Sequence, residues 1–355
     1  MKIAVDCRMI GKSGIGVYIE NILYEFVNHY SVEHQFLLVG EQAVLEKYIG
    51  QTNISVLYVD ISIFSVQELF RFPTKKINEC DIFYTPNFNI PGGIHIPVCS
   101  TIHDVIFLDI PAQTSFLGKI IRYCYLWRAI KKSDKIFTVS DFSRTRILYH
   151  FPSSKNVIVT YSAISRHIHE YKRKTPAFFD FPYVLFIGNI KIHKGLPVLL
   201  EAFRKAKCEN YKNKLVIVGE HQSFITSDKA ISKLLQKENE DIKFTGKIDN
   251  SMLYNLLANA KLFVLPSVYE GFGLPPLEAL YFGCPVLLSD IPVFREIYED
   301  LPVFFFKVND SDDLSRQLMK IERNPHFFDS DKICKKIDHK YNFEFIAQKI
   351  INNLE

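Results

Sequence analysis

The sequence predicts an α/β protein of two domains, each built on a mainly parallel sheet. The chain has 355 residues, which suits two α/β domains of ordinary size. Hydrophobic residues make up 48% of the chain, enough for a substantial core. Short apolar runs alternate with helical patterns from one end to the other, and strands interleaved with helices imply parallel sheets.

The first domain is expected at residues 1–170 and contains seven apolar runs that are typical of buried strands. The first run is followed by a loop that contains Gly11, Gly14 and Gly16, and a helix with apolar residues three and four apart begins near Val17. The expected strands are 2–5, 35–39, 54–59, 82–84, 98–102, 135–139 and 157–159.

A polar and basic stretch that contains Pro176 predicts an interdomain linker at 171–182, because this composition is typical of connecting segments. The second domain is then expected at 183–340, and a helical pattern from Phe343 to Leu354 follows it. Its expected strands are 183–188, 215–219, 242–245, 262–265, 285–288 and 302–306.

The net charge of +4 and the isoelectric point near 8.5 are only mildly basic. They do not indicate a nucleic-acid partner, but they are compatible with an acidic small ligand or an anionic lipid surface. The seven cysteines are scattered without a C-x-x-C pair, so we expect reduced thiols and neither disulfides nor metal ligands. We expect no signal peptide and no membrane-spanning run, and therefore a cytoplasmic protein.

The stretch from Ser267 to Leu280 joins the apolar run 262–265 to a glycine loop and a short helix that begins with two prolines. Loop N–H groups and a helix N-terminus together favour an anion. Glu270 precedes the loop and Glu278 follows it by eight positions. Taken alone, these residues are more typical of an ordinary turn, in which glycines and an early helical acid are common.

The full string from Ser267 to Leu280, however, resembles the E-x7-E element of the family 4 glycosyltransferases, a group 1 type that includes bacterial O-antigen mannosyl- and rhamnosyltransferases. The resemblance implies the GT-B fold, in which two Rossmann-like domains face a central cleft. The first domain would bind the acceptor and the second would bind the nucleotide sugar. The resemblance also implies that the C-terminal helix, within 341–355, packs back on the first domain.

The resemblance implies that the motif from Ser267 to Leu280 binds the donor. Its diphosphate would lie on the amides of the four loop residues, and Glu278 would accept hydrogen bonds from the ribose. Glu270 would face the transferred sugar and position it, because the family is thought to retain the anomeric configuration by same-face attack. The four loop residues are Gly271, Phe272, Gly273 and Leu274.

The first glycine loop and a strand end in the first domain add further candidates. The Gly-Ile-Gly-Val-Tyr string that contains Gly14 and Gly16 resembles the N-terminal loop of the same family, where the backbone approaches a phosphate or an acceptor. The loop lacks the third glycine of a dinucleotide fingerprint, which argues against NAD. His103 and Asp104 follow a strand, and in the family such a His contacts the transferred sugar.

The stretch from Gly188 to Gly195 resembles the family's diphosphate clamp, which has an Arg after the first glycine and a Lys before the second. Lys194 matches the second cation, and a leaving diphosphate needs at least one fixed positive charge. Asn189 stands where the Arg is usual, so Lys191 or His193 would have to replace that charge. The plain alternative for Lys194 is a solvated residue at the start of a helix.

Two D-x-D patterns, Asp310 to Asp312 and Asp329 to Asp331, match the metal-diphosphate motif of other glycosyltransferases. Both lie late, in polar stretches, and Asp310 is better explained as a helix N-cap. We therefore expect no metal and no other cofactor. Residues 115–132 combine apolar bulk with five basic residues, which favours a core-packing helix with a solvated face over a helix on anionic lipid.

These observations predict a retaining, metal-independent glycosyltransferase that moves a hexose from a nucleotide-diphosphate sugar to a saccharide or lipid-linked saccharide. The resemblance implies cell-surface polysaccharide synthesis (O-antigen, capsule or lipopolysaccharide), with possible contact at the inner face of the membrane. Three alternatives stay open: a sugar-nucleotide epimerase or phosphorylase-like enzyme, an NAD-linked oxidoreductase, and a non-catalytic nucleotide-sugar-binding subunit.

Overall fold

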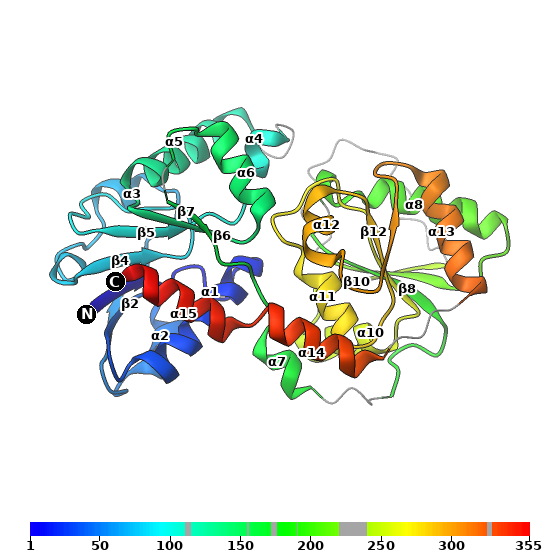
Figure 1. Cartoon of the computed structure of the whole chain (residues 1–355), viewed down its shortest axis with the longest axis horizontal. Coiled ribbons are helices and arrows are strands. Elements are labelled where there is room, and N and C mark those ends of the chain that lie inside the picture. The colour runs from blue at the N-terminus through cyan, green and yellow to red at the C-terminus, as the bar shows by residue number, and fades with distance from the viewer. Residues whose placement is uncertain (111–114, 155, 172–175, 190, 220–239, 325–328) are drawn as a thin grey trace. The chain divides into compact units, whose positions relative to one another are not determined.

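A computed structural model describes residues 1–110, 115–154, 156–171, 176–189, 191–219, 240–324 and 329–355 of the chain (Figure 1). It divides into two compact domains. The first consists of Met1–Ser165 together with Tyr341–Glu355, and the second of Arg166–Lys340. The chain therefore leaves the first domain once and returns to it at the C-terminus.

The first domain contains a seven-stranded sheet in the order β3-β2-β1-β4-β5-β6-β7, and all of its strand pairs are parallel. All seven strands lie within one residue of their predicted bounds at either end. The strands are β1 (Lys2–Asp6), β2 (Gln35–Gly40), β3 (Ile54–Tyr58), β4 (Ile82–Thr85), β5 (Val98–Thr101), β6 (Lys135–Thr138) and β7 (Val157–Val159).

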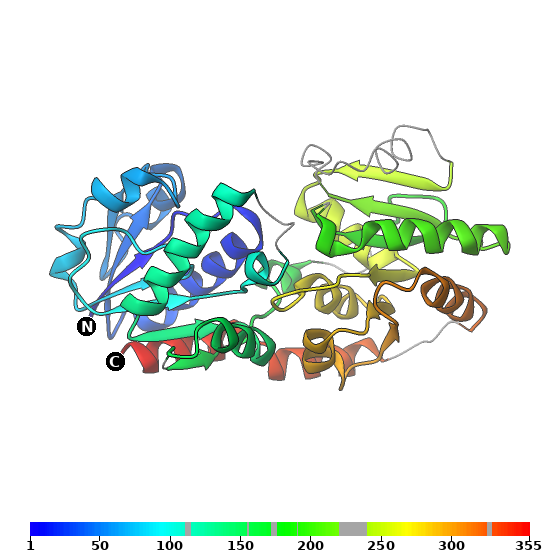
Figure 2. The same ribbon diagram turned by 90° about the horizontal axis from the view of Figure 1, so that it is seen from above.

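The α-helices of the first domain are α1 (Ser13–Glu25), α2 (Gln42–Leu45), α3 (Val66–Phe70), α4 (Ile106–Asp109), α5 (Phe116–Lys132), α6 (Asp141–His150) and α15 (Phe343–Leu354). The C-terminal helix α15 packs on α1, where the ring of Phe343 meets that of Tyr18 at 5.9 Å. Both views place the two chain ends at the same end of this domain (Figures 1 and 2).

The second domain contains a six-stranded parallel sheet in the order β10-β9-β8-β11-β12-β13. Its strands are β8 (Tyr183–Ile187), β9 (Lys214–Val218), β10 (Ile242–Gly246), β11 (Leu262–Leu265), β12 (Val286–Ser289) and β13 (Val303–Phe306). The order reverses between β8 and β11, so the loops that follow these two strands open on the crevice where open α/β sheets bind ligands.

The α-helices described in the second domain are α7 (Arg166–Glu170), α8 (Leu196–Cys208), α10 (Asn250–Asn259), α11 (Leu274–Tyr281), α12 (Pro292–Tyr298), α13 (Ser311–Arg323) and α14 (Ser330–Lys340). Helices α8 and α13 lie side by side (Figure 2), and α14 packs on α11. Asp310 caps α13 by accepting from the N–H groups of Asp312 and Asp313, as predicted.

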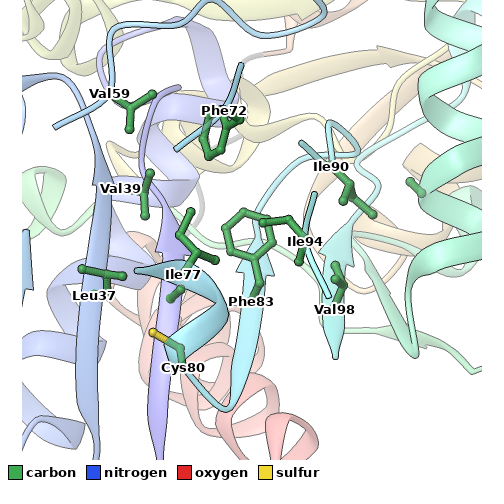
Figure 3. Packing of buried hydrophobic residues seen from close by; sticks show 12 residues of the cluster. Leu37, Val39, Val59, Phe72, Ile77, Cys80, Phe83, Ile90, Ile94 and Val98 are labelled. Atoms are coloured by element: carbon green, nitrogen blue, oxygen red, sulfur yellow. The ribbon is translucent and has the colours of Figure 1, made fainter. Parts of the chain in front are cut away.

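The strands are predictable because they are apolar and buried. In the first domain, side chains from β1, β2, β4 and β5 form one hydrophobic cluster with the segments around Ile77 and Ile90. Ile77 and Ile94 lie on either side of Phe83, which is fully buried (Figure 3). Parallel strands covered by helices read as continuous apolar runs, which is the pattern of this sequence.

One buried cluster in the first domain is polar. Arg8 follows β1, and its Nη2 lies 2.6 Å from both Asp6 Oδ2 and Glu68 Oε1. Asn89 donates to the same Glu68 oxygen at 2.9 Å, and all four side chains are almost completely buried. The charges are therefore compensated inside the domain. The ion pair between Arg8 and Glu68 connects the end of β1 to α3.

The first domain boundary differs from the expected one. Residues up to 170 were assigned to the first domain, but α7 belongs to the second. Ile168 is buried, and the ring of His169 contacts Tyr281 of α11 at a centroid distance of 5.0 Å. A single buried isoleucine among polar residues gives no periodic signal, so this segment was not recognised as the first helix of the second domain. The expected linker residues 172–175 lie outside the described residues.

Candidate active site

The two loops that were expected to bind the donor meet in the second domain. Strands β8 and β11 are paired, so the segment after β8 and the segment after β11 start side by side. The N–H of Val268 donates to the carbonyl of His193 at 2.8 Å. Gly195 adopts a φ of +67°, and a Cβ there would lie 2.0 Å from the Pro266 carbonyl oxygen. Glycine is therefore required for this close approach.

This contact brings Lys194 to Glu270. The Nζ of Lys194 donates to Oε1 of Glu270 at 2.7 Å, and Ser267 Oγ donates to the same oxygen at 2.6 Å. The Lys194 and Glu270 side chains are only 18% and 10% exposed. Ser289, at the end of β12, donates its hydroxyl hydrogen to the Ser267 carbonyl. The carboxylate is thus held in one orientation near the surface of the domain.

The turn between Glu270 and α11 has a fixed shape. Gly273 has a φ of +88°, and a Cβ there would lie 2.7 Å from the ring of Phe294. The Tyr298 hydroxyl donates to the Gly273 carbonyl. Positive φ and the close ring both exclude a side chain at Gly273, so the predicted loop is held by α12 as well as by its own sequence.

Helix α11 begins with few N–H groups because Pro275 and Pro276 have none. Among the described residues, no acceptor takes the N–H of Gly273 or of Leu274. These two groups stand at the positive end of the helix and are free for an anion. They are two of the four amides of the expected cradle.

Glu278 is the second acid of the motif and has a different environment. It is half-buried on α11, and its carboxyl group forms no hydrogen bond or ion pair with any residue that the structure describes. Burial raises its pKa from 4.5 to about 7. A carboxyl group left without donors is suited to accept hydrogen bonds from ligand hydroxyl groups.

The segment after β8 shows which residue could supply the positive charge of the Arg that Asn189 replaces. Asn189 is exposed, and its carbonyl accepts from the N–H of Lys191 at 2.8 Å. His193 is buried, and burial lowers its pKa to about 4, so it is neutral near pH 7 and cannot replace a cation. Lys191 is the exposed alternative. A Cβ at Gly188 would lie in ordinary contact with the Lys194 stem, 3.7 Å from its Cδ.

The predicted residues of the first domain form a separate group. His103 Nε2 lies 3.0 Å from the Pro86 carbonyl oxygen, and its ring meets Tyr18 edge-on at 4.9 Å. Burial lowers the pKa of His103 to about 4, so the neutral ring donates from Nε2. Asp104 accepts from the N–H of Ile106, the first residue of α4, which favours a structural role for it.

The two glycines at the start of α1 differ from each other. A Cβ at Gly16 would lie 2.4 Å from the Met9 carbonyl oxygen, so packing within the domain already requires glycine there. A Cβ at Gly14 would meet nothing within 4 Å. Gly14 is therefore the glycine whose backbone is open to a ligand, and Gly16 shapes the loop that presents it.

Three residues around the motif were not predicted: Ser267, Phe294 and Tyr298. Ser267 lies three positions before Glu270, so its place in the string was a usable signal. Tyr298 reaches Gly273 from 25 positions away. Nothing in the local sequence indicates that contact, because it depends on how α12 packs.

Within the described part of the chain, no three or more His, Cys, Asp or Glu side chains gather as metal ligands would. The same residues include no helix that is long and apolar enough to cross a bilayer. Both D-x-D patterns start helices: Asp329, like Asp310, accepts from N–H groups two and three positions later.

Comparison with known proteins agrees with these features. Residues 167–340 match the family model "Glycosyl transferases group 1". O-antigen chain mannosyltransferase B of Escherichia coli is 28% identical over 251 residues, which cover 67% of this chain and 64% of that protein. O-antigen chain mannosyltransferase RfbU of Salmonella typhimurium is 26% identical, over 71% of this chain and 67% of its own length.

Solved structures show the same fold over the whole chain. The crystal structure of Anabaena Alr3699/HepE in complex with UDP and glucose superposes with a TM-score of 0.73 at 17% identity, covering 100% of this chain and 99% of that one. The lipopolysaccharide outer core galactosyltransferase WaaB, in its apo form, gives 0.66 at 19% identity, covering 99% and 98%. The fold is therefore GT-B, with two Rossmann-like domains, and its second domain matches the group 1 glycosyltransferase model.

Proposed function

We propose that this protein transfers a hexose from a nucleotide-diphosphate sugar to a saccharide or lipid-linked saccharide during cell-surface polysaccharide synthesis. The observation that carries the proposal is the arrangement of Lys194, Glu270 and Ser267 beside the two free N–H groups at the start of α11. The relatives named as O-antigen mannosyltransferases support the acceptor class and favour mannose as the sugar.

Each part of the donor has a proposed partner in the second domain. The diphosphate lies against the N–H groups of Gly273 and Leu274, where the helix dipole favours negative charge. Lys194 is the fixed cation that stabilises the leaving diphosphate as the glycosidic bond breaks. Glu278 accepts hydrogen bonds from the ribose hydroxyl groups, which supply the donors that its carboxyl lacks among the described residues.

Glu270 is proposed to position the sugar and not to attack it. Its Oε1 already accepts from both Lys194 and Ser267, which lowers its nucleophilicity and fixes its orientation. The departing diphosphate leaves an oxocarbenium-like centre, and the acceptor hydroxyl attacks the same face while the leaving phosphate takes its proton. This route retains the anomeric configuration. In the first domain, the neutral His103 ring is proposed to contact the transferred sugar.

The transfer is proposed to need no metal and no other cofactor, because Lys194 and the helix N-terminus provide the positive charge. EDTA in the transfer assay should leave the rate unchanged. A rate that falls with EDTA and recovers with Mg²⁺ or Mn²⁺ would remove this part of the proposal.

A cytoplasmic location with peripheral contact at the inner membrane face is also proposed, through the basic residues of α5. Co-sedimentation with vesicles of phosphatidylglycerol tests it. Changing Lys119, Arg122, Lys131 and Lys132 together to Glu should abolish the binding, since anionic lipid attracts each of them. Equal sedimentation of the changed protein and the natural one would exclude this contact.

Two measurements test the main proposal. A panel of UDP-, GDP- and dTDP-linked hexoses should contain one that raises the melting temperature, because a ligand of the folded state stabilises it. With that donor and a lipid-linked saccharide, product analysis should show a new glycosidic bond of retained configuration. Glu270→Ala should lower kcat far more than Glu278→Ala, whose loss should fall mainly on KM. Equal small losses would contradict the assigned roles.

A further inference from the structure

The fixed cation of the candidate donor site is already compensated in the free protein. Lys194 and Glu270 are bonded at 2.7 Å, and their side chains are only 18% and 10% exposed. Lys191 is the nearest other cation along the chain, but it is exposed, so water and salt screen its charge. Among the described residues, the positive charge left for a ligand phosphate is mainly that of the free N–H groups at the start of α11.

The two carboxylate oxygens of Glu270 have different environments. Oε1 accepts from both Lys194 Nζ and Ser267 Oγ, at 2.7 and 2.6 Å. Oε2 accepts from no residue that the structure describes, although the side chain reaches the surface. Glu270 therefore presents one unpartnered oxygen to a ligand. A sugar hydroxyl can donate to this oxygen, whereas a fully ionised phosphate has no hydrogen to donate and is repelled.

The position of this carboxylate is fixed by a chain of hydrogen bonds. Ser289, at the end of β12, donates to the Ser267 carbonyl, and the Ser267 hydroxyl in turn donates to Oε1 of Glu270. Both serines are completely buried. A flexible carboxylate would turn away from a nearby anion. This one cannot do so without breaking a short hydrogen bond from a buried hydroxyl group.

Sugar transfer changes the charge on the phosphate that such a site would hold. In the donor, the β-phosphate is esterified to C1 of the sugar and carries one negative charge. On the route proposed above, the C1–O bond breaks with its electron pair on the phosphate oxygen. The acceptor oxygen bonds to C1, and its proton goes to the phosphate. Water takes up that proton above about pH 6, so the product phosphate then carries nearly two charges.

We propose that Glu270 discriminates against the nucleoside diphosphate product and speeds its release. A phosphate that accepts from Lys194 lies within about 5 Å of the Glu270 carboxylate, because the same ammonium is bonded to both. Besides the N–H groups of α11, one ammonium then faces two anions. The second charge of the product is uncompensated in a largely buried site, and the carboxylate repels it. The inference rests on the proposed function, because it requires the diphosphate to lie beside Lys194.

Binding of UDP, GDP and their β-methyl esters to the full chain at pH 8 measures the discrimination. The methyl cap removes only the second charge of the β-phosphate. Isothermal titration calorimetry gives the ratio of the Kd of each free diphosphate to the Kd of its ester. Glu270→Gln removes the charge and keeps the size, and should lower this ratio at least tenfold. Surface plasmon resonance should show at least tenfold slower dissociation of the free diphosphate from the same variant.

Three further variants separate the charge from other effects. Ser267→Ala keeps the carboxylate but lets it turn away, and should lower the ratio at least threefold. Lys194→Met should weaken all four ligands without lowering the ratio, because the repulsion loses its compensating cation. Glu299→Gln is the matched control, since it removes the same charge from an exposed position of the same domain. It should leave the ratio unchanged.

An unchanged ratio in a folded Glu270→Gln protein would overturn the inference, and an equal fall in Glu299→Gln would show a general effect of net charge instead. If Glu270→Gln does not fold in circular dichroism, the ratio in Ser267→Ala decides in the same way. Nucleotide-sugar binding by the natural protein is measured on the same samples. If a nucleotide sugar binds while the ratio stays constant, the inference alone is wrong. If no nucleotide sugar binds, the proposed function is wrong and the inference with it.

Discussion

The carboxyl group of Glu278 makes a measurable prediction about stability. Its pKa is about 7 in the folded protein, against 4.5 for an ordinary Glu. Between these values the folded state binds the proton more tightly than the unfolded state, so stability falls as pH rises from about 4.5 to 7 and then levels off. The shift corresponds to about 3 kcal/mol at pH 8, taking about 1.4 kcal/mol for each pKa unit.

Replacing Glu278 by Gln removes the ionisable group while keeping its size. At pH 8 the variant should be more stable than the natural protein by up to about 3 kcal/mol, and at pH 4 the difference should nearly vanish. For a domain of this size, that raises the melting temperature at pH 8 by roughly 2–4 °C for each kcal/mol. Circular dichroism melts of both proteins across this pH range give the comparison.

The matched control is Glu299→Gln, since Glu299 is an exposed acid of the same domain. It should show no pH-dependent gain. The same Glu278→Gln protein should bind the nucleotide sugar less tightly, because an amide accepts weaker hydrogen bonds from ribose than a carboxylate does. A constant stability difference from pH 4 to pH 8 would show that Glu278 titrates normally and would refute this account of the site.

Three further predictions concern other residues. Lys194→Met should lower kcat by about 100-fold or more, since a preorganised charge at a leaving group is worth that much; donor kinetics measure it, and a change in KM alone would contradict the role. Gly273→Ala should destabilise the protein by about 2–4 kcal/mol, through positive φ and the Phe294 contact. Arg8→Met should cost about 3–5 kcal/mol in denaturation, because two carboxylates are left buried, with donor affinity unchanged.

The sequence was most informative where structure depends on local pattern. All thirteen strands in the described part of the chain were predicted, because a strand covered by helices on both faces is an apolar run that polar turns interrupt. The turn before α11 was also predicted from the local sequence, through the string that contains Glu270 and Glu278. The strand, the loop and the helix follow one another directly there. The helix at 343–354 was also predicted, and it packs on the first domain.

Features that depend on tertiary contacts could not be predicted. The reason that Gly273 must be glycine lies partly in Phe294, which belongs to another helix. The orientation of Glu270 depends on Lys194, which is 76 positions away. The short helix α7 was assigned to the first domain because its contacts with the second, such as that of the exposed His169 with Tyr281, leave no periodic pattern.

The contrast between the two acids of the motif leads to a last prediction. Among the residues that the structure describes, Lys194 and Ser267 donate to Glu270 and none donates to Glu278, so Glu278 has to obtain donors from the ligand. A carboxyl group with a pKa of about 7 is half protonated at pH 7, and hydrogen bonds from ribose favour its ionised form. Donor binding at pH 7 should therefore release about half a proton.

Isothermal titration calorimetry with a nucleotide sugar, in buffers of different ionisation enthalpy, measures this release. Nucleotide sugars suit the experiment because their diphosphate does not titrate near pH 7. The release should disappear in Glu278→Gln and at pH 9, where the carboxyl is already ionised in the free protein. If the Gln variant released the same fraction of a proton, another group would be titrating, and the ribose would have to be assigned to a different residue.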